Sequence, residues 1–164
     1  MYEYRVTKYD PAKRDHRGAY LADEWIFYAQ IGETFNGVVF TADQYQATED
    51  AYVAAAIAFV KESGGDCLKV TYLENKKGHK EASFDLHQGV TLNATEIEHV
   101  CRLNLREAIW CKLEDDAGRF IHFGWDYYMF VGVPTACEGA KALAHELGLF
   151  VEEFESPCRD SETA

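Results

Sequence analysis

Apolar and polar residues alternate at the start of the chain, and this period of two predicts a strand. Tyr2, Tyr4 and Val6 alternate with polar neighbours, which is typical of a half-buried strand. Segments rich in aromatic and β-branched residues predict further strands. These cover 25–31, 67–73, 83–87, 108–113 and 149–154. The apolar stretch 120–133 is interrupted by Gly124-Trp125-Asp126, so we expect a hairpin with its turn there.

Spacings of three and four between apolar residues predict three helices. In the first, which begins at Ala42, one face is apolar except for Glu49. Gly64-Gly65 provides the left-handed stop. Each predicted helix follows a Gly-Val pair and a capping box, in which an N-cap side chain and a Gln or Glu three residues later exchange hydrogen bonds with the backbone. The three boxes are Thr41 with Gln44, Asn93 with Glu96, and Thr135 with Glu138.

The order of these elements predicts an α+β fold. We expect a mainly antiparallel sheet of six to eight strands, with three helices mostly on one face. The recurring Gly-Val pairs and boxes suggest strand–helix–strand units with an internal repeat. A chain of 164 residues is typical of a single domain, which we place at 1–157. A flexible tail is expected at 158–164, and a polar turn at 75–79.

The charge of the chain restricts its partners. Sixteen Lys and Arg against 28 Asp and Glu give a formal net charge of −12. Nucleic acid and anionic membranes are therefore not expected as partners, because both attract basic surfaces. An acidic surface can serve only to keep the protein solvated, or it can attract and bind a basic protein.

The cysteines and histidines offer weak chemical signals. Five cysteines without a Cys-x-x-Cys pair favour free thiols and a cytoplasmic protein. No apolar run is long enough to span a bilayer. We considered three nucleophile or base candidates, Cys111, Cys137 and His145, because the start of a helix near Cys137 can lower a thiol pKa. No metal site or cofactor is expected, since His99 and Cys101 point in different directions on a helix.

The aromatic segment 120–130 is the most distinctive candidate for a site. A turn at 124–126 would expose Trp125, and Tyr127 or Tyr128 would face away from the packed side. Such rings suit a recognition surface, although a strand covered on both faces would explain them equally well. His122 and Asp126 have the character of a base and its orienting carboxylate, but the segment contains no obvious nucleophile.

Two charged clusters complete the candidates. Glu114, Asp115 and Asp116 occupy a predicted turn and would form an acidic face if they converged with Trp125. Carboxylates in turns are more often merely solvated. The basic residues Lys13, Arg14 and Arg17 lie in a predicted loop and are candidates for anion binding, or for pairing with the acidic C-terminal end.

Several segments together resemble a family of small uncharacterised bacterial proteins for which no activity is established. The resemblance covers most of the chain. It implies a bacterial, cytoplasmic origin and carries over no catalytic or binding residue. The segments that carry it are Tyr4-Arg5-Val6-Thr7-Lys8-Tyr9-Asp10-Pro11, Arg17-Gly18-Ala19-Tyr20-Leu21, Trp110-Cys111-Lys112-Leu113-Glu114, His122-Phe123-Gly124-Trp125-Asp126-Tyr127-Tyr128-Met129 and Gly148-Leu149-Phe150-Val151-Glu152.

Two functions remain open from the sequence. The first is an acidic protein-binding domain that neutralises or regulates a partner, for example an immunity protein of a bacterial toxin system. That comparison is one of general character and not of motif. The alternative is a small-molecule enzyme or sensor for a phosphate or nucleotide, with a pocket between sheet and helices.

Overall fold

The computed structural model describes residues 1–75 and 82–159 and contains a seven-stranded antiparallel sheet. The strand order is β5-β4-β6-β7-β8-β1-β9, and every neighbouring pair is antiparallel. The predicted α+β class is thus confirmed. The strands are β1 (Tyr2–Thr7), β4 (Cys67–Asn75), β5 (Thr91–Asn93), β6 (Ile109–Glu114), β7 (Phe120–Phe123), β8 (Met129–Val133) and β9 (Phe150–Glu153).

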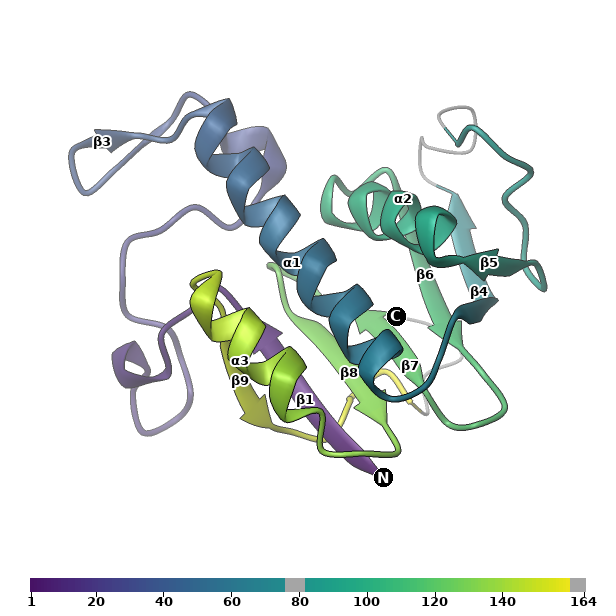
Figure 1. Cartoon of the computed structure of the whole chain (residues 1–164). Helices are drawn as coiled ribbons and strands as arrows, with labels where there is room; N and C mark the ends of the chain where they lie inside the picture. The colour runs from purple at the N-terminus through teal and green to yellow at the C-terminus, as the bar shows by residue number, and fades with distance from the viewer. Residues whose placement is uncertain (76–81, 160–164) are drawn as a thin grey trace.

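Three helices cover one face of this sheet (Figure 1). They are α1 (Ala42–Glu62), α2 (Ala94–Leu105) and α3 (Glu138–Glu146). The first two capping boxes form as predicted. The third prediction was wrong: α3 begins after Cys137, whose backbone is left-handed and whose side chain makes no capping bond. The predicted internal repeat is not confirmed.

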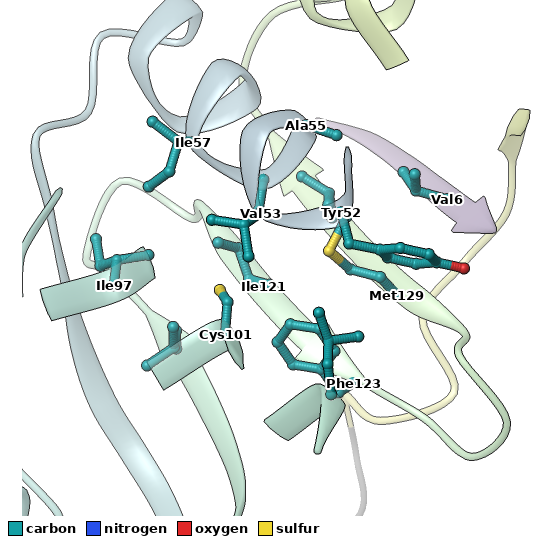
Figure 2. Packing of buried hydrophobic residues seen from close by; sticks show 14 of the residues in the cluster. Val6, Tyr52, Val53, Ala55, Ile57, Ile97, Cys101, Ile121, Phe123 and Met129 are labelled. Atoms are coloured by element: carbon teal, nitrogen blue, oxygen red, sulfur yellow. The ribbon is translucent and has the colours of Figure 1, made fainter. Parts of the chain in front are cut away.

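The main core lies between α1, α2 and the sheet. Figure 2 shows Tyr52 and Val53 of α1 and Ile97 of α2 near Ile121 and Met129 of the sheet. All five side chains are almost fully buried. Burial of this kind supplies the main free energy of folding, at about 25 cal/mol per Å² of apolar surface removed from water.

Glu49, the acidic residue on the apolar face of α1, is buried and paired. Arg106 donates to it through Nε at 2.8 Å, and Arg102 donates through Nη1 at 2.8 Å. These bonds hold the pKa of the carboxyl below its ordinary value, although burial opposes them. The exception to the apolar pattern therefore joins α1 to α2.

Two predicted strands are wrong. Residues 25–27 are irregular and Tyr28–Gln30 is a short 3-10 helix, because the rings there pack in a loop: Trp25 stacks on Phe40 with ring centroids 4.3 Å apart. The segment 83–87 is also irregular. The strand that pairs with the outer side of β4 is instead β5, which begins a few residues after this segment.

A small hairpin projects from the N-terminal half of the molecule (Figure 1). It consists of β2 (Thr34–Phe35) and β3 (Val38–Val39). Asn36 and Gly37 both have positive φ, as a tight hairpin turn requires. Phe40 closes the hairpin ladder by donating its N–H to Glu33.

The second face of the sheet is crossed by the C-terminal strap, which we define as residues 154–159. Ser156 donates its N–H to Glu3, and Lys112 donates to the carbonyl of Cys158. Arg159 pairs with Glu3. Cys158 and Arg159, which we expected in a flexible tail, therefore contact the sheet. Residues 160–164 and positions 76–79 of the predicted polar turn lie outside the described residues.

Within the described segments, no helix is both long enough and apolar enough to cross a bilayer.

Candidate functional site

The turn between β7 and β8 has an unusual backbone for its residues. Gly124 donates to Tyr128 O at 2.7 Å, and Tyr128 donates to Trp125 O at 3.2 Å. Asp126 and Tyr127 have φ of 57° and 65°, the geometry of a type I′ turn. Asp tolerates this region, but Tyr is strained there, typically at a cost of about 1–3 kcal/mol. The surrounding structure must therefore hold the turn.

Buried tyrosine hydroxyls provide that support. Tyr9 donates to Asp126 O at 2.7 Å, and Tyr52 donates to Tyr127 O at 2.6 Å. Tyr127 itself donates to Leu105 O at 2.6 Å. Burial raises the pKa of Tyr9 and Tyr52 well above the ordinary value, so both remain protonated donors. The turn is thus fixed from behind.

The turn places its rings on different sides. Trp125 is 67 % exposed at the tip, as predicted, whereas Tyr127 is 6 % exposed. Tyr127 therefore belongs to the core, and the prediction of an exposed ring there was wrong, although the residue lines one of the hollows described below. Its ring is edge-on to those of Trp25 and Tyr52. The left-handed turn directs it inward although its neighbour Trp125 points to solvent.

Tyr128 is half-buried and lies beside two guanidinium groups. Arg5 and Arg14 lie 5.6 and 5.4 Å from its ring centroid. Arg14 also donates to its hydroxyl at 2.8 Å. The ring thus supports the base of the turn.

Two hollows flank Trp125 where β7 ends and β8 begins, one on the helix face of the sheet and one on the strap face. On the helix side is the acidic hollow, with a volume of about 130 Å³, whose lining includes the carboxyl groups of Glu74, Glu107 and Asp126. On the strap side is the apolar groove, about 390 Å³, lined by Tyr128, Phe130, Pro157 and Cys158. Trp110, Phe123, Gly124, Trp125 and Asp126 line both hollows. They form a shared wall.

The acidic hollow combines three carboxyl groups with two tryptophan rings. No Lys or Arg of the described residues lines it. Trp110 is fixed because its indole N–H donates to Phe123 O at 2.7 Å. The hollow is therefore suited to a cationic group, which the carboxylates and the ring faces would both attract.

Backbone strain is concentrated at this hollow. Among the described residues, five other than glycine have a left-handed φ, and three of them line the acidic hollow: Glu107, Asp126 and Tyr127. Glu107 follows α2 at a position where helices usually have glycine, with φ of 56°. Strained residues of this kind gather at functional sites.

The predicted acid cluster of Glu114, Asp115 and Asp116 lies at the opposite end of β7 from Trp125. Glu114 pairs with Phe120, at the start of β7, whereas Trp125 follows the end of that strand. Asp115 accepts from Arg119 Nε at 2.7 Å, and Asp116 is exposed. The cluster does not converge with Trp125, so the acidic face considered from the sequence is not formed.

His122 connects Glu114 to the strap. Its Nε2 atom lies 2.7 Å from Glu114 Oε1, and its Nδ1 atom lies 3.1 Å from Ser156 Oγ. The hydrogen bond from His122 lowers the pKa of Glu114. The order resembles an acid–base–nucleophile triad, and sequence reasoning missed Ser156. However, Ser156 is 4 % and His122 0 % exposed, and neither lines the adjacent hollows. We interpret the array as a latch that holds the strap.

The cysteine candidates are poorly suited to nucleophilic chemistry. Cys137 is buried, and burial raises its pKa, the opposite of the predicted effect of a helix start. Burial also raises the pKa of Cys111 to about 12. His145 lies on the exposed side of α3. In residues 1–75 and 82–159, no three His, Cys, Asp or Glu side chains gather as a metal-binding group.

The predicted anion-binding residues largely contact groups of the protein itself. Lys13 lies 4.0 Å from Glu24. Arg14 donates to Gly18 O and to Tyr128, while its Nε and Nη2 atoms are shielded without a hydrogen-bond partner in the described structure. Arg17 is exposed. Lys13 and Arg17 are the members of the group that face solvent.

Sequence reasoning missed Glu74, Glu107 and Trp110 as parts of the site. Glu74 lies near the end of β4, Glu107 is the second residue after α2, and Trp110 belongs to β6. Only the folded sheet brings them together. Their spacing carries no motif that would have indicated this. No family model, curated protein or solved structure matches the chain, so the function is argued from geometry alone.

Proposed function

We propose that this protein binds a basic partner protein through the Trp125 surface, which comprises the acidic hollow, the apolar groove and their shared wall. The observation that carries the proposal is an exposed Trp at the tip of a turn that buried tyrosines hold rigid. Large rings on preorganised backbones are typical centres of binding energy, because little entropy is lost when they are covered.

The size of the site favours a protein partner over a small molecule. Pockets for cofactor-sized ligands usually measure about 300–1,000 Å³ and enclose most of the ligand. The acidic hollow, at about 130 Å³, has room for one side chain, and the neighbouring groove lies along the surface. The cysteine pKa values also give no support to the alternative of an enzyme.

The charge of the whole molecule supports a basic partner. A formal net charge of −12 accelerates encounter with a basic protein at low ionic strength. Neutralisation of such a partner, as by an immunity protein in the bacterial cytoplasm, is the activity we propose. This role would need no catalysis by the chain.

Capture of the partner tests this proposal. The full-length protein, tagged and immobilised, is exposed to a lysate of its own organism, and bound proteins are compared between wild type and Trp125→Ala. We expect a stoichiometric basic protein whose affinity falls by about 2 kcal/mol or more, roughly 30-fold, in the variant. Raising the salt concentration should slow its association.

Asp116→Asn is the matched control, because Asp116 is exposed at the other end of β7. It removes an acidic charge without altering the Trp125 surface. Capture that is equal with wild type and Trp125→Ala, or absent with both, would contradict the proposal.

A further inference from the structure

We infer that the segment of the partner that docks here pairs a Lys or Arg side chain with a bulky apolar side chain one or two residues away. The cation enters the acidic hollow and the apolar side chain enters the groove, with the backbone passing over Trp125. This inference rests on the proposed function and specifies its recognition chemistry. The two hollows share a wall of five residues, so the two side chains must be near neighbours.

The protein already holds two of its own cations in the arrangement that the acidic hollow offers. Lys8 Nζ lies 4.2 and 4.3 Å from the ring centroids of Tyr9 and Trp25, and 3.1 Å from Glu24. Arg5 lies 4.2 Å from the Phe154 ring centroid and 2.9 Å from Glu152. A carboxylate beside an aromatic face is thus how this fold binds ammonium and guanidinium groups.

The acidic hollow repeats that composition at the surface. Trp110 and Trp125 supply ring faces, and Glu107 and Asp126 supply carboxyl groups from strained, fixed backbone. Fixed ligands lose little entropy when a cation binds between them. A partly desolvated contact of a cation with a ring adds attraction that a solvated surface carboxylate alone does not.

The apolar groove specifies the second side chain. Its distinctive lining comes from Tyr128 of the turn, Phe130 of β8, and Pro157 and Cys158 of the strap. Phe130 is 4 % exposed, so the floor of the groove is firmly packed. A leucine-sized or aromatic side chain that entered the groove would have its apolar surface removed from water, which is favourable. A second charged side chain would lose its hydration there, which is costly.

A peptide selection on the full-length protein tests the inference. Phage that display random dodecapeptides are selected on wild type, and the pool is then measured on two double variants. Glu107→Gln/Asp126→Asn, which we call the neutralised variant, removes two of the three carboxylate charges of the acidic hollow and leaves Glu74. Asn suits the left-handed backbone at position 126. Asp116→Asn/Glu155→Gln removes two charges from exposed residues elsewhere and is the matched control. Circular dichroism verifies that both variants are folded.

We expect enriched peptides in which Lys or Arg lies one or two positions from Leu, Ile, Phe or Trp. Binding should fall about tenfold on Glu107→Gln/Asp126→Asn and less than twofold on the control. Replacement of the peptide Arg by citrulline, its neutral isostere, should weaken peptide binding to wild type about tenfold. It should hardly change binding to the neutralised variant, because both changes remove the same contact.

Peptides that depend on Trp125 but contain no basic residue, or that bind the neutralised variant equally well, would overturn the inference and leave the proposed surface intact. A pool that binds Trp125→Ala as tightly as wild type, or a selection that enriches no sequence, would overturn the inference as well. The proposed function itself fails only if capture of the partner from lysate is independent of Trp125.

Discussion

The two turns at the ends of β7 use similar residues in opposite ways. In the segment before β7, residues 114–119, two of the three carboxylates bond to groups of the protein: Glu114 bonds to His122, and Asp115 bonds to Arg119. The turn after β7, residues 124–128, is held from behind by Tyr9 and Tyr52, which bond to its carbonyl groups. Its outward side chains are consequently left to face solvent and the two hollows.

This difference shows that a cluster of polar or aromatic residues forms a surface site only where other groups stabilise its backbone. In the first turn the acidic side chains stabilise their own loop. In the second, the buried hydroxyls of Tyr9 and Tyr52 perform that task. Substitutions in the two turns should therefore separate stability from binding.

The largest effect is expected for Tyr127→Ala. Removing this buried ring and its bond to Leu105 should lower the free energy of unfolding by about 3–5 kcal/mol, as for other large aromatic residues in cores. Trp125→Ala, two residues away, should change it by less than about 0.5 kcal/mol. Urea unfolding followed by circular dichroism measures both. Equal losses would mean that the two rings do not differ in role.

Tyr52→Phe should have the next largest effect. The change removes one hydroxyl that donates to Tyr127 O and accepts from Lys8 N–H at 2.7 Å. Both partners would be left unsatisfied in a buried site, at about 1–3 kcal/mol of unfolding free energy. Thermal unfolding tests this, with Tyr72→Phe as control.

The control residue lies near the sheet edge, and within residues 1–75 and 82–159 its hydroxyl bonds to the exposed Glu74 alone, at 3.3 Å. Its loss should cost less than about 0.5 kcal/mol. If Tyr52→Phe is as mild as the control, the turn is not held by its tyrosine support. Partner affinity should fall in Tyr52→Phe even though Tyr52 cannot touch the partner.

Local sequence patterns predicted much of the fold, because most helix starts and turns form where their typical residues occur. The boxes at Thr41 and Asn93 form, and the hairpin turn follows Gly124 as expected. The third box does not form because the backbone of Cys137, two positions after the predicted cap, is left-handed and the helix begins only after it. Such a backbone usually requires glycine, so the sequence gives no warning of it.

The site was less predictable because its contacts are distant in sequence. The burial of Tyr127 depends on Leu105 and Tyr52, and the acidic hollow requires Glu74 and Glu107 from other elements. Likewise, Glu49 was noted as an exception, but its two arginine partners lie more than fifty residues away. Alternation along a strand predicts which face of the sheet each side chain occupies. It cannot predict the directions of side chains in a strained turn such as 124–128.

A smaller effect is expected for Asp115→Ala in the first turn. Asp115 accepts from the N–H groups of Ala117 and Arg119 at 2.9 and 3.0 Å and from the Arg119 side chain. Losing these bonds should cost about 1–2 kcal/mol of unfolding free energy, measured in urea. Asp116→Ala should cost less than about 0.5 kcal/mol. Neither should alter partner affinity, and a binding defect in Asp115→Ala would contradict the separation of the two turns.

The smallest effect concerns the pH dependence of Glu114. Its pKa is lowered from the ordinary value of 4.5, mainly by the hydrogen bond from His122. Folding therefore favours the ionised carboxylate. The resulting stability is complete above the pKa of the unfolded chain and is lost as the pH falls through the lower pKa of the folded state.

Glu114→Gln isolates this contribution, because Gln can still accept from His122 but does not titrate in this range. The unfolding free energy of wild type relative to that of Glu114→Gln should fall as the pH drops below about pH 5. Other carboxylates, such as Glu49, titrate in both proteins and cancel in the difference. Partner binding above pH 5 should be unchanged, because the latch lies on the side of β7 where the charges face the protein. A difference that stays flat down to pH 3 would mean that His122 does not favour the ionised form of Glu114, and the first turn would then lose one of the two contacts that set it apart from the second.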